Sequence, residues 1–115
     1  MKVLKPLLLA AALAADSVNA AEQNRPQRLV AAGGAVTEII YALGLGDRVV
    51  GSDISSLWPE EVKQLPRIGY LRTLSAEGIL ALRPDLLVTT SEAGPPAALE
   101  HLRANPAAGR ADSQP

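Results

Sequence analysis

Tyr70 and Arg72 are the side chains most suited to chemistry, and they stand two positions apart in the stretch IGYLR, residues 68–72. The chain has two tyrosines, one tryptophan and no phenylalanine, so a ring outside the periodic apolar segments needs a reason beyond core packing. A phenolate oxygen is a hard donor that suits ferric iron, and a neighbouring cation stabilises the phenolate. We therefore predict that Tyr70 is a metal ligand with Arg72 beside it. The alternative is that Tyr70 covers the sheet edge and Arg72 is a solvated charge.

Other side chains that could contact a ligand occur singly, outside any recognisable motif. Arg67 flanks the same loop and could meet an anionic group of a ligand, although a plain surface charge is the simpler interpretation. Glu92, which begins the stretch EAGPPAALE, could border the same site or be an ordinary loop carboxylate. His101 is the only histidine, and no second metal ligand accompanies it at a regular spacing. Trp58 precedes Pro59 and is expected to pack over its loop.

The sequence shows no signature of an enzyme. It offers no arrangement of Ser, His and Asp that could be defended as a triad. The stretch AAGGAVTE, residues 31–38, resembles a phosphate-binding turn, but it lacks both the G-x-G-x-x-G pattern and a Walker lysine. A tight strand-to-helix turn lining a cleft is the preferred interpretation. Glu38 is expected to serve the start of the following helix, and a functional contact through it stays open.

Alternating strands and helices must position these residues. Residues 28–32, 49–51 and 86–90 read as short buried strands, the first breaking at Gly33-Gly34. The apolar spacing of residues 36, 39, 40 and 43 predicts an amphipathic helix that packs Tyr41 and ends at Gly44. The turn-rich segment 52–66 is expected to hold one helical turn, after Pro59.

Two further helices follow. Ser75 is a plausible N-cap, with Glu77 in the first turn and Pro84 ending the helix. A last helix begins after Gly94-Pro95, with Ala98, Leu99 and Leu102 on one side. Strands that alternate with helices predict an α/β fold with a parallel sheet and right-handed crossovers. Residues 105–115 have no strand pattern and are expected to form a disordered or aberrant tail.

Composition and the N-terminus limit the class of protein. Eleven Lys and Arg against twelve Asp and Glu give a net charge of −1, which argues against nucleic-acid binding. Lys2 and Lys5 precede the apolar run 7–15, and a small-residue cleavage pattern ends at Ala20, so residues 1–20 are predicted to be a secretory signal peptide, followed by a polar lead at 21–27. A membrane anchor is the alternative, but the run is shorter than the ~20 residues that a bilayer needs. The expected location is the periplasm or the extracellular space.

From Arg28 to about Ala104 the chain resembles the N-terminal lobe of periplasmic haem-binding proteins of ABC importers. These belong to the wider iron-chelate and vitamin B12 binding class. The resemblance is carried by the stretches GGAVTEIIYALGLGDRVVGSD, LPRIGYLRTLSAEGILALRPDLLV and SEAGPPAALEHLR. It implies a Rossmann-like parallel sheet with flanking helices, as one lobe of a bilobed protein that holds its ligand in the cleft between lobes. Such proteins are more than twice this length.

The resemblance also implies roles for individual residues. Tyr70 is the expected axial ligand of the haem iron, and Arg72, with Arg67 as a second candidate, would pair with the phenolate or a haem propionate. Glu77 corresponds to the glutamate that docks with arginines of the ABC permease in the inner membrane. A carboxylate at a helix start also stabilises the helix by roughly 0.3–1 kcal/mol. Haem is then a transported ligand, and a monomer is expected in solution.

The resemblance ends near Ala104, where the family continues with another strand, a linking helix and a second lobe. A truncated or frameshifted reading frame would produce such an ending. One lobe supplies one wall for an apolar macrocycle, so we expect this chain to bind haem weakly or not at all. The alternatives are a ferric siderophore or cobalamin binding protein of the same class, or a secreted interaction module or nonfunctional remnant.

Overall fold

The computed structural model describes residues 25–105 and the backbone of residues 110–114. The predicted signal peptide, residues 1–20, lies outside the described residues, as does most of the polar lead. Within the described part of the chain, no helix has the length and apolar character needed to cross a membrane.

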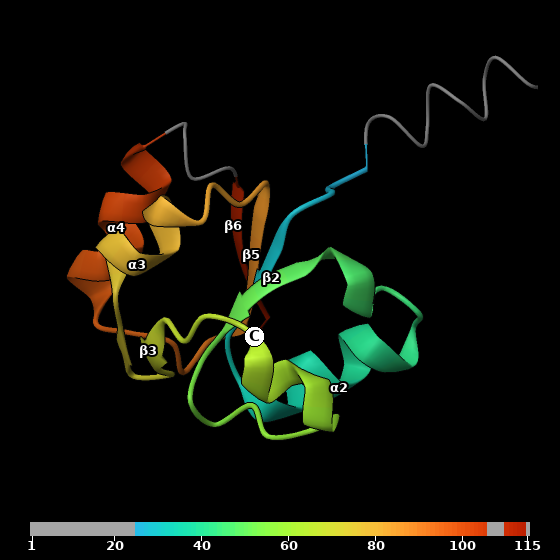
Figure 1. Cartoon of the computed structure of the whole chain (residues 1–115). Coiled ribbons are helices and arrows are strands. Elements are labelled where there is room, and N and C mark those ends of the chain that lie inside the picture. The colour runs from blue at the N-terminus through green and yellow to red at the C-terminus, as the bar shows by residue number, and fades with distance from the viewer. Residues whose placement is uncertain (1–24, 106–109, 115) are drawn as a thin grey trace, which may run out of the picture.

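A parallel four-stranded sheet forms the centre of the fold, in the order β2-β1-β5-β6 (Figure 1). Its strands are β1 (Leu29–Ala31), β2 (Val49–Ser52), β5 (Leu86–Thr90) and β6 (Arg110–Gln114). Leu29 of β1 pairs with Val49 on one side and with Leu86 on the other. The prediction of an α/β fold with a parallel sheet is therefore confirmed, and β1, first in sequence, lies inside the sheet.

Short helices and one hairpin connect the strands. The helices are α2 (Gly34–Ala42), α3 (Ala76–Ala81) and α4 (Pro96–Ala104), with 3-10 turns η1 (Gly46–Arg48) and η2 (Glu60–Gln64). The residues between η2 and α3 form a two-stranded antiparallel hairpin, β3 (Gly69–Tyr70) and β4 (Thr73–Leu74). Ser75 caps α3 as predicted, since its hydroxyl accepts a hydrogen bond of 3.0 Å from the Gly78 amide. Gly44 follows α2 with the expected positive φ of 79°.

Alternate residues of β1 face two separate hydrophobic layers. Val30 packs with a cluster that includes residues of α3, β5 and α4, namely Ile79, Leu87 and Leu102. Leu29 and Ala31 pack instead with α2 and β2. Their partners there are Val36, Ile40 and Val49. Figure 1 shows the same division, with α3 and α4 on one side of the sheet and α2 on the other. A strand buried on both faces explains why residues 28–32 read as a continuous apolar run.

The expectation of no strand after Ala104 is wrong for residues 110–114. They form β6, which pairs in parallel with all five residues of β5. Nothing in the stretch RADSQ favours a strand by composition, because Asp and Ala are depleted in strands. The strand is stabilised by backbone hydrogen bonds to the edge of β5. Local sequence propensity does not include such hydrogen bonds.

The face that α2 buries is narrower than its apolar spacing predicts. Val36, Thr37 and Ile40 are buried, whereas Ile39 is 58% exposed and Leu43 is 68% exposed. The interpretation of Glu38 as a helix-start residue is also wrong, because α2 begins at Gly34 and its first turn holds no acidic residue. α2 therefore presents an apolar and acidic surface to the outside.

Candidate ligand-binding site

The carboxyl ends of β1 and β5 mark the place where this sheet is expected to bind a ligand. β1 leads through α2 to β2 on one side, and β5 leads through α4 to β6 on the other. In open α/β sheets, ligands bind in the crevice at such a reversal of strand order. A hollow of about 330 Å³ lies there, lined by Gly33, Gly34, Ala35, Val36, Leu71, Thr90, Ser91 and Glu92.

A second hollow adjoins the first and contains the residues that the sequence singled out. It measures about 350 Å³ and is lined by Ser55, Tyr70, Leu71, Arg72 and Glu92. The two hollows share Leu71 and Glu92. The structure thus brings together Tyr70, Arg72 and Glu92 at the carboxyl edge of the sheet.

Tyr70 projects from the hairpin with its hydroxyl free. The residue is 51% exposed, and its phenolic oxygen forms no hydrogen bond with any residue that the structure describes. A hydroxyl without a partner on an exposed residue is available to a ligand. The site therefore has the open donor that the metal-ligand prediction requires.

Hydrogen bonds on both sides hold the hairpin in place. The Ile54 amide donates to the carbonyl oxygen of Gly69 at 2.9 Å, which ties the hairpin to the loop after β2. On the other side the Gly94 amide donates to the carbonyl oxygen of Leu71 at 3.0 Å, and the Leu74 amide donates to that of Gly94 at 2.8 Å. Tyr70 is therefore mounted on backbone that is anchored to both neighbouring loops.

Arg72 and Glu92 form a loose ion pair across the second hollow. Arg72 Nη2 lies 3.7 Å from Glu92 Oε2, and both side chains are largely exposed. Exposed pairs of this kind contribute about 0–1 kcal/mol. The Arg72 guanidinium is therefore bound only weakly by Glu92, and an anionic group of a ligand can compete for it.

Arg67 is not the plain surface charge that the simpler interpretation predicted. Its Nη1 donates hydrogen bonds of 2.7 Å to the carbonyl oxygen of Asp53 and 2.8 Å to that of Ser56. The side chain is partly buried and fastens the loop after β2. Its predicted role at the ligand has no further support, because Arg67 does not line either hollow.

Asp53 is a buried residue of this region that sequence reasoning missed. The side chain is fully buried, and its carboxylate accepts hydrogen bonds from the Gly33 amide at 2.9 Å, Ser55 Oγ at 2.6 Å and Ser56 Oγ at 2.7 Å. Ser56 Oγ also lies 2.7 Å from Thr37 Oγ1. Asp53 therefore fixes the Gly33 turn that lines the first hollow. The signal in the sequence was Asp followed by Ser at the second and third positions, a turn pattern.

The remaining predicted residues lie outside the two hollows. Glu77 is exposed in the first turn of α3, and His101 is exposed on α4. Trp58 is 64% exposed, so the expectation that it packs over its loop is wrong. In the described ranges, His, Cys, Asp and Glu side chains do not gather in any group of three that could hold a metal ion.

Comparison with known proteins identifies the family. The model of the periplasmic binding protein family matches residues 29–108, which is most of the chain. The chain belongs to the periplasmic binding protein family. Among solved structures of this family, a periplasmic haem-binding protein from Pseudomonas aeruginosa is 48% identical with a TM-score of 0.74, over 77% of this chain and 31% of that one. A periplasmic haem-binding protein from Roseiflexus sp. RS-1 is 47% identical with a TM-score of 0.71, over 78% of this chain and 34% of that one.

A curated relative in the same family has a different ligand in its name. The vitamin B12-binding protein of Yersinia pestis (strain Pestoides F) is 34% identical over 101 residues, which is 88% of this chain and 36% of the relative. The chain thus spans about a third of the length of the family members that it matches. It is a periplasmic binding protein of the haem and vitamin B12 class.

Proposed function

We propose that this chain forms one lobe of the haem-binding component of an ABC importer, with haem as the transported ligand. The observation that carries the proposal is the free Tyr70 hydroxyl at the carboxyl edge of the sheet. These two haem-binding structures are 48% and 47% identical to this chain, whereas a vitamin B12-binding structure matched over a similar share of the chain is 32% identical, and this difference supports haem over cobalamin.

The chemistry of the site suits an iron porphyrin with carboxylate side chains. Ferric iron is a hard cation, and a tyrosinate is among the protein ligands that hold haem iron. Arg72 stands two residues from Tyr70 on the same hairpin, and its guanidinium can pair with a propionate in place of Glu92. Leu71 offers an apolar side chain between the two hollows.

Both hollows are open, so the macrocycle would contact this lobe on one face. Burial of both faces needs a second wall, which we propose is supplied by the part of a longer family member that this chain does not span. Glu77, exposed on α3, is proposed as a contact to the permease, and export by residues 1–20 would place the protein in the periplasm. With one wall, we expect a dissociation constant for haem above about 10 μM.

Titration of the full chain with hemin, followed by visible absorbance, tests the proposal. Tyr70→Phe removes the proposed donor oxygen and should abolish the phenolate-to-iron band. Tyr41→Phe is a matched control, because the chain has only two tyrosines and Tyr41 lies away from both hollows. A band that survives Tyr70→Phe, or that disappears with Tyr41→Phe, would show that Tyr70 is not the ligand.

Cobalamin is the second candidate, because the curated relative at 34% identity is named for vitamin B12. Cobalamin is not held through a tyrosinate in this scheme, so its binding should survive Tyr70→Phe almost unchanged. Parallel titrations with hemin and cyanocobalamin therefore separate the two. Cobalamin binding that is tighter than hemin binding in the unmodified chain would favour the second candidate.

A further inference from the structure

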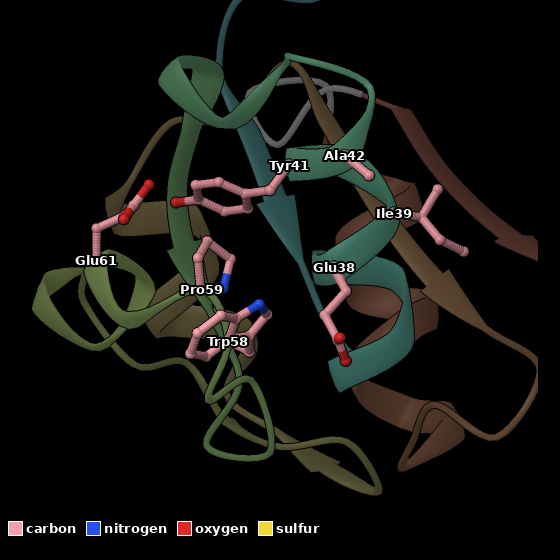
Figure 2. Close-up of a pocket in the computed structure, with 7 residues that line it drawn as sticks. All are labelled: Glu38, Ile39, Tyr41, Ala42, Trp58, Pro59 and Glu61. Atoms are coloured by element: carbon pink, nitrogen blue, oxygen red, sulfur yellow. The ribbon is translucent and has the colours of Figure 1, made fainter.

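A groove on the outer side of α2 has no role in the proposed ligand site. Its volume is about 530 Å³, and it is lined by Glu38, Ile39, Tyr41, Ala42, Trp58, Pro59 and Glu61. Figure 2 shows Tyr41 directed from α2 toward Pro59 and Glu61, with Glu38 on the same helix. Two aromatic rings and two carboxylates thus border one hollow.

The apolar residues of this groove are exposed well beyond what core packing explains. Trp58 is 64% exposed and Ile39 is 58% exposed. Two neighbours in sequence are exposed as well: Leu43, the C-cap residue of α2, at 68% and Leu57, which precedes Trp58, at 58%. Extended apolar surfaces of this kind mark places where another protein binds.

The two carboxylates of the groove are uncompensated. Within the described residues, neither Glu38 nor Glu61 forms a hydrogen bond or an ion pair. The nearest lysine in sequence, Lys63, is paired with Glu60 at 3.0 Å. The groove therefore carries negative charge with no cation of its own.

Tyr41 reports the same negative environment. Partial burial of the ring raises the pKa of Tyr41, and the nearby carboxylates of Glu61 and Asp47 raise it further. The ring therefore offers an aromatic face beside the carboxylates of Glu38 and Glu61. A cation placed here gains from both.

We propose that this groove docks a polypeptide segment that presents an arginine side chain between apolar residues. A guanidinium is planar, stacks on aromatic rings and pairs with carboxylates, so it matches Trp58, Glu38 and Glu61 together. The exposed side chains of Ile39 and Trp58 in the groove favour a polypeptide over a small free cation, which would leave them uncovered. Because α2 and α3 lie on opposite sides of the sheet, this surface is separate from Glu77 (Figure 1).

Trp58 supplies the test, since it is the only tryptophan in the chain and its fluorescence reports on the groove alone. The full chain is titrated with the blocked tripeptide acetyl-Leu-Arg-Leu-amide. The same peptide with citrulline in place of arginine keeps the shape and loses the charge, and is expected to bind about five- to tenfold more weakly. Agmatine carries the arginine side chain without a peptide backbone. If the groove binds a polypeptide, agmatine should bind more weakly than the arginine peptide.

Glu38→Gln and Glu61→Gln are each expected to weaken binding of the arginine peptide several-fold and to leave binding of the citrulline peptide unchanged. Glu100→Gln is the matched control, because Glu100 is an exposed carboxylate on α4, on the opposite side of the sheet. Circular dichroism verifies that the variants are folded. The proposal is overturned if the two peptides bind alike, if neither changes the Trp58 emission, or if agmatine binds as tightly as the arginine peptide.

Discussion

Asp53 shows how a buried charge can organise the edge of the sheet. Its carboxylate accepts hydrogen bonds from the Gly33 amide and from two serine hydroxyls, so the desolvated charge is satisfied locally. Gly33 has a φ of 110°, a conformation that favours glycine. The hydrogen bond from its amide to Asp53 therefore holds together a turn and a loop that come from different strands.

Replacement of Asp53 should be costly. Asp53→Ala leaves the Gly33 amide and two hydroxyls without an acceptor in a buried position, and we expect a loss of about 2–4 kcal/mol in the free energy of unfolding. Urea denaturation measures the change. Asp47→Ala is the control, since Asp47 is exposed in η1 and should change stability by less than about 0.5 kcal/mol. Equal effects of the two variants would contradict a structural role for Asp53.

The pKa of Tyr41 gives a direct measurement of the electrostatic environment of the groove. In Tyr70→Phe it is the only tyrosine, so an absorbance titration near 295 nm follows its ionisation alone, and the midpoint should lie above the ordinary pKa of about 10. The folded state holds this proton more tightly than the unfolded state. The resulting stability is complete below about pH 10 and is lost as the pH rises through the folded pKa.

Glu61→Gln should lower this midpoint only in part, because burial of the ring is the larger cause. A midpoint at or below about 10 in the folded chain would contradict the raised pKa and weaken the case for a negatively charged groove.

At the same scale, sequence reasoning singled out the residue that differed most from its surroundings. Tyr70 was conspicuous as a ring outside the periodic segments, and the structure brings it together with Arg72 and Glu92. Asp53 was not conspicuous, because its role depends on an amide twenty positions earlier in the chain. Contacts of that range are set by the packing of strands, which a local pattern does not contain.

The hairpin β3–β4 depends on Gly69, whose φ is 98°. A Cβ at this position would lie 2.7 Å from the carbonyl oxygen of Thr73, closer than real contacts allow. Gly69→Ala therefore combines backbone strain with a collision, and we expect a loss of about 2–3 kcal/mol in stability. The change should also weaken any hemin binding that depends on Tyr70, because the ring would move with the hairpin.

Gly44→Ala is the control for Gly69. Gly44 also has a positive φ, of 79°, but a Cβ there meets nothing within 4 Å. Its replacement should cost about 1–2 kcal/mol from strain alone. The difference between the two variants in a thermal or urea melt isolates the collision, and a larger loss for Gly44→Ala would contradict this account of the hairpin.

The elements were predicted well where local signals and packing agree. The strand at residues 86–90 and the cap at Ser75 follow from an apolar run bounded by turn signals and from a hydroxyl before a helix. β6 was missed because its pairing with β5 is tertiary, and the outer face of α2 was misjudged because apolar spacing cannot show which apolar residues find a partner. The exposed Ile39 lines the separate groove on the outer side of α2.

For the whole molecule, β6 covers an edge that would otherwise be open. All five residues of β5 pair with it. A chain that ends at Asn105 would leave the backbone groups of β5 unpaired on that side, so we expect lower stability and a tendency to self-associate. Denaturation and analytical ultracentrifugation measure the two effects. A shortened chain with unchanged stability and a monomeric mass would show that β6 contributes little.

The position of β1 inside the sheet has a consequence for how the chain acquires its structure. The strand comes first in sequence, yet Leu29 finds its partners only at Val49 and Leu86. Each pairing closes a long loop before any hydrogen bond compensates the lost chain entropy, an order of events typical of slow-folding topologies. A polypeptide growing from its N-terminus therefore cannot complete the pairing of β1 until the segment through Val88 has been made.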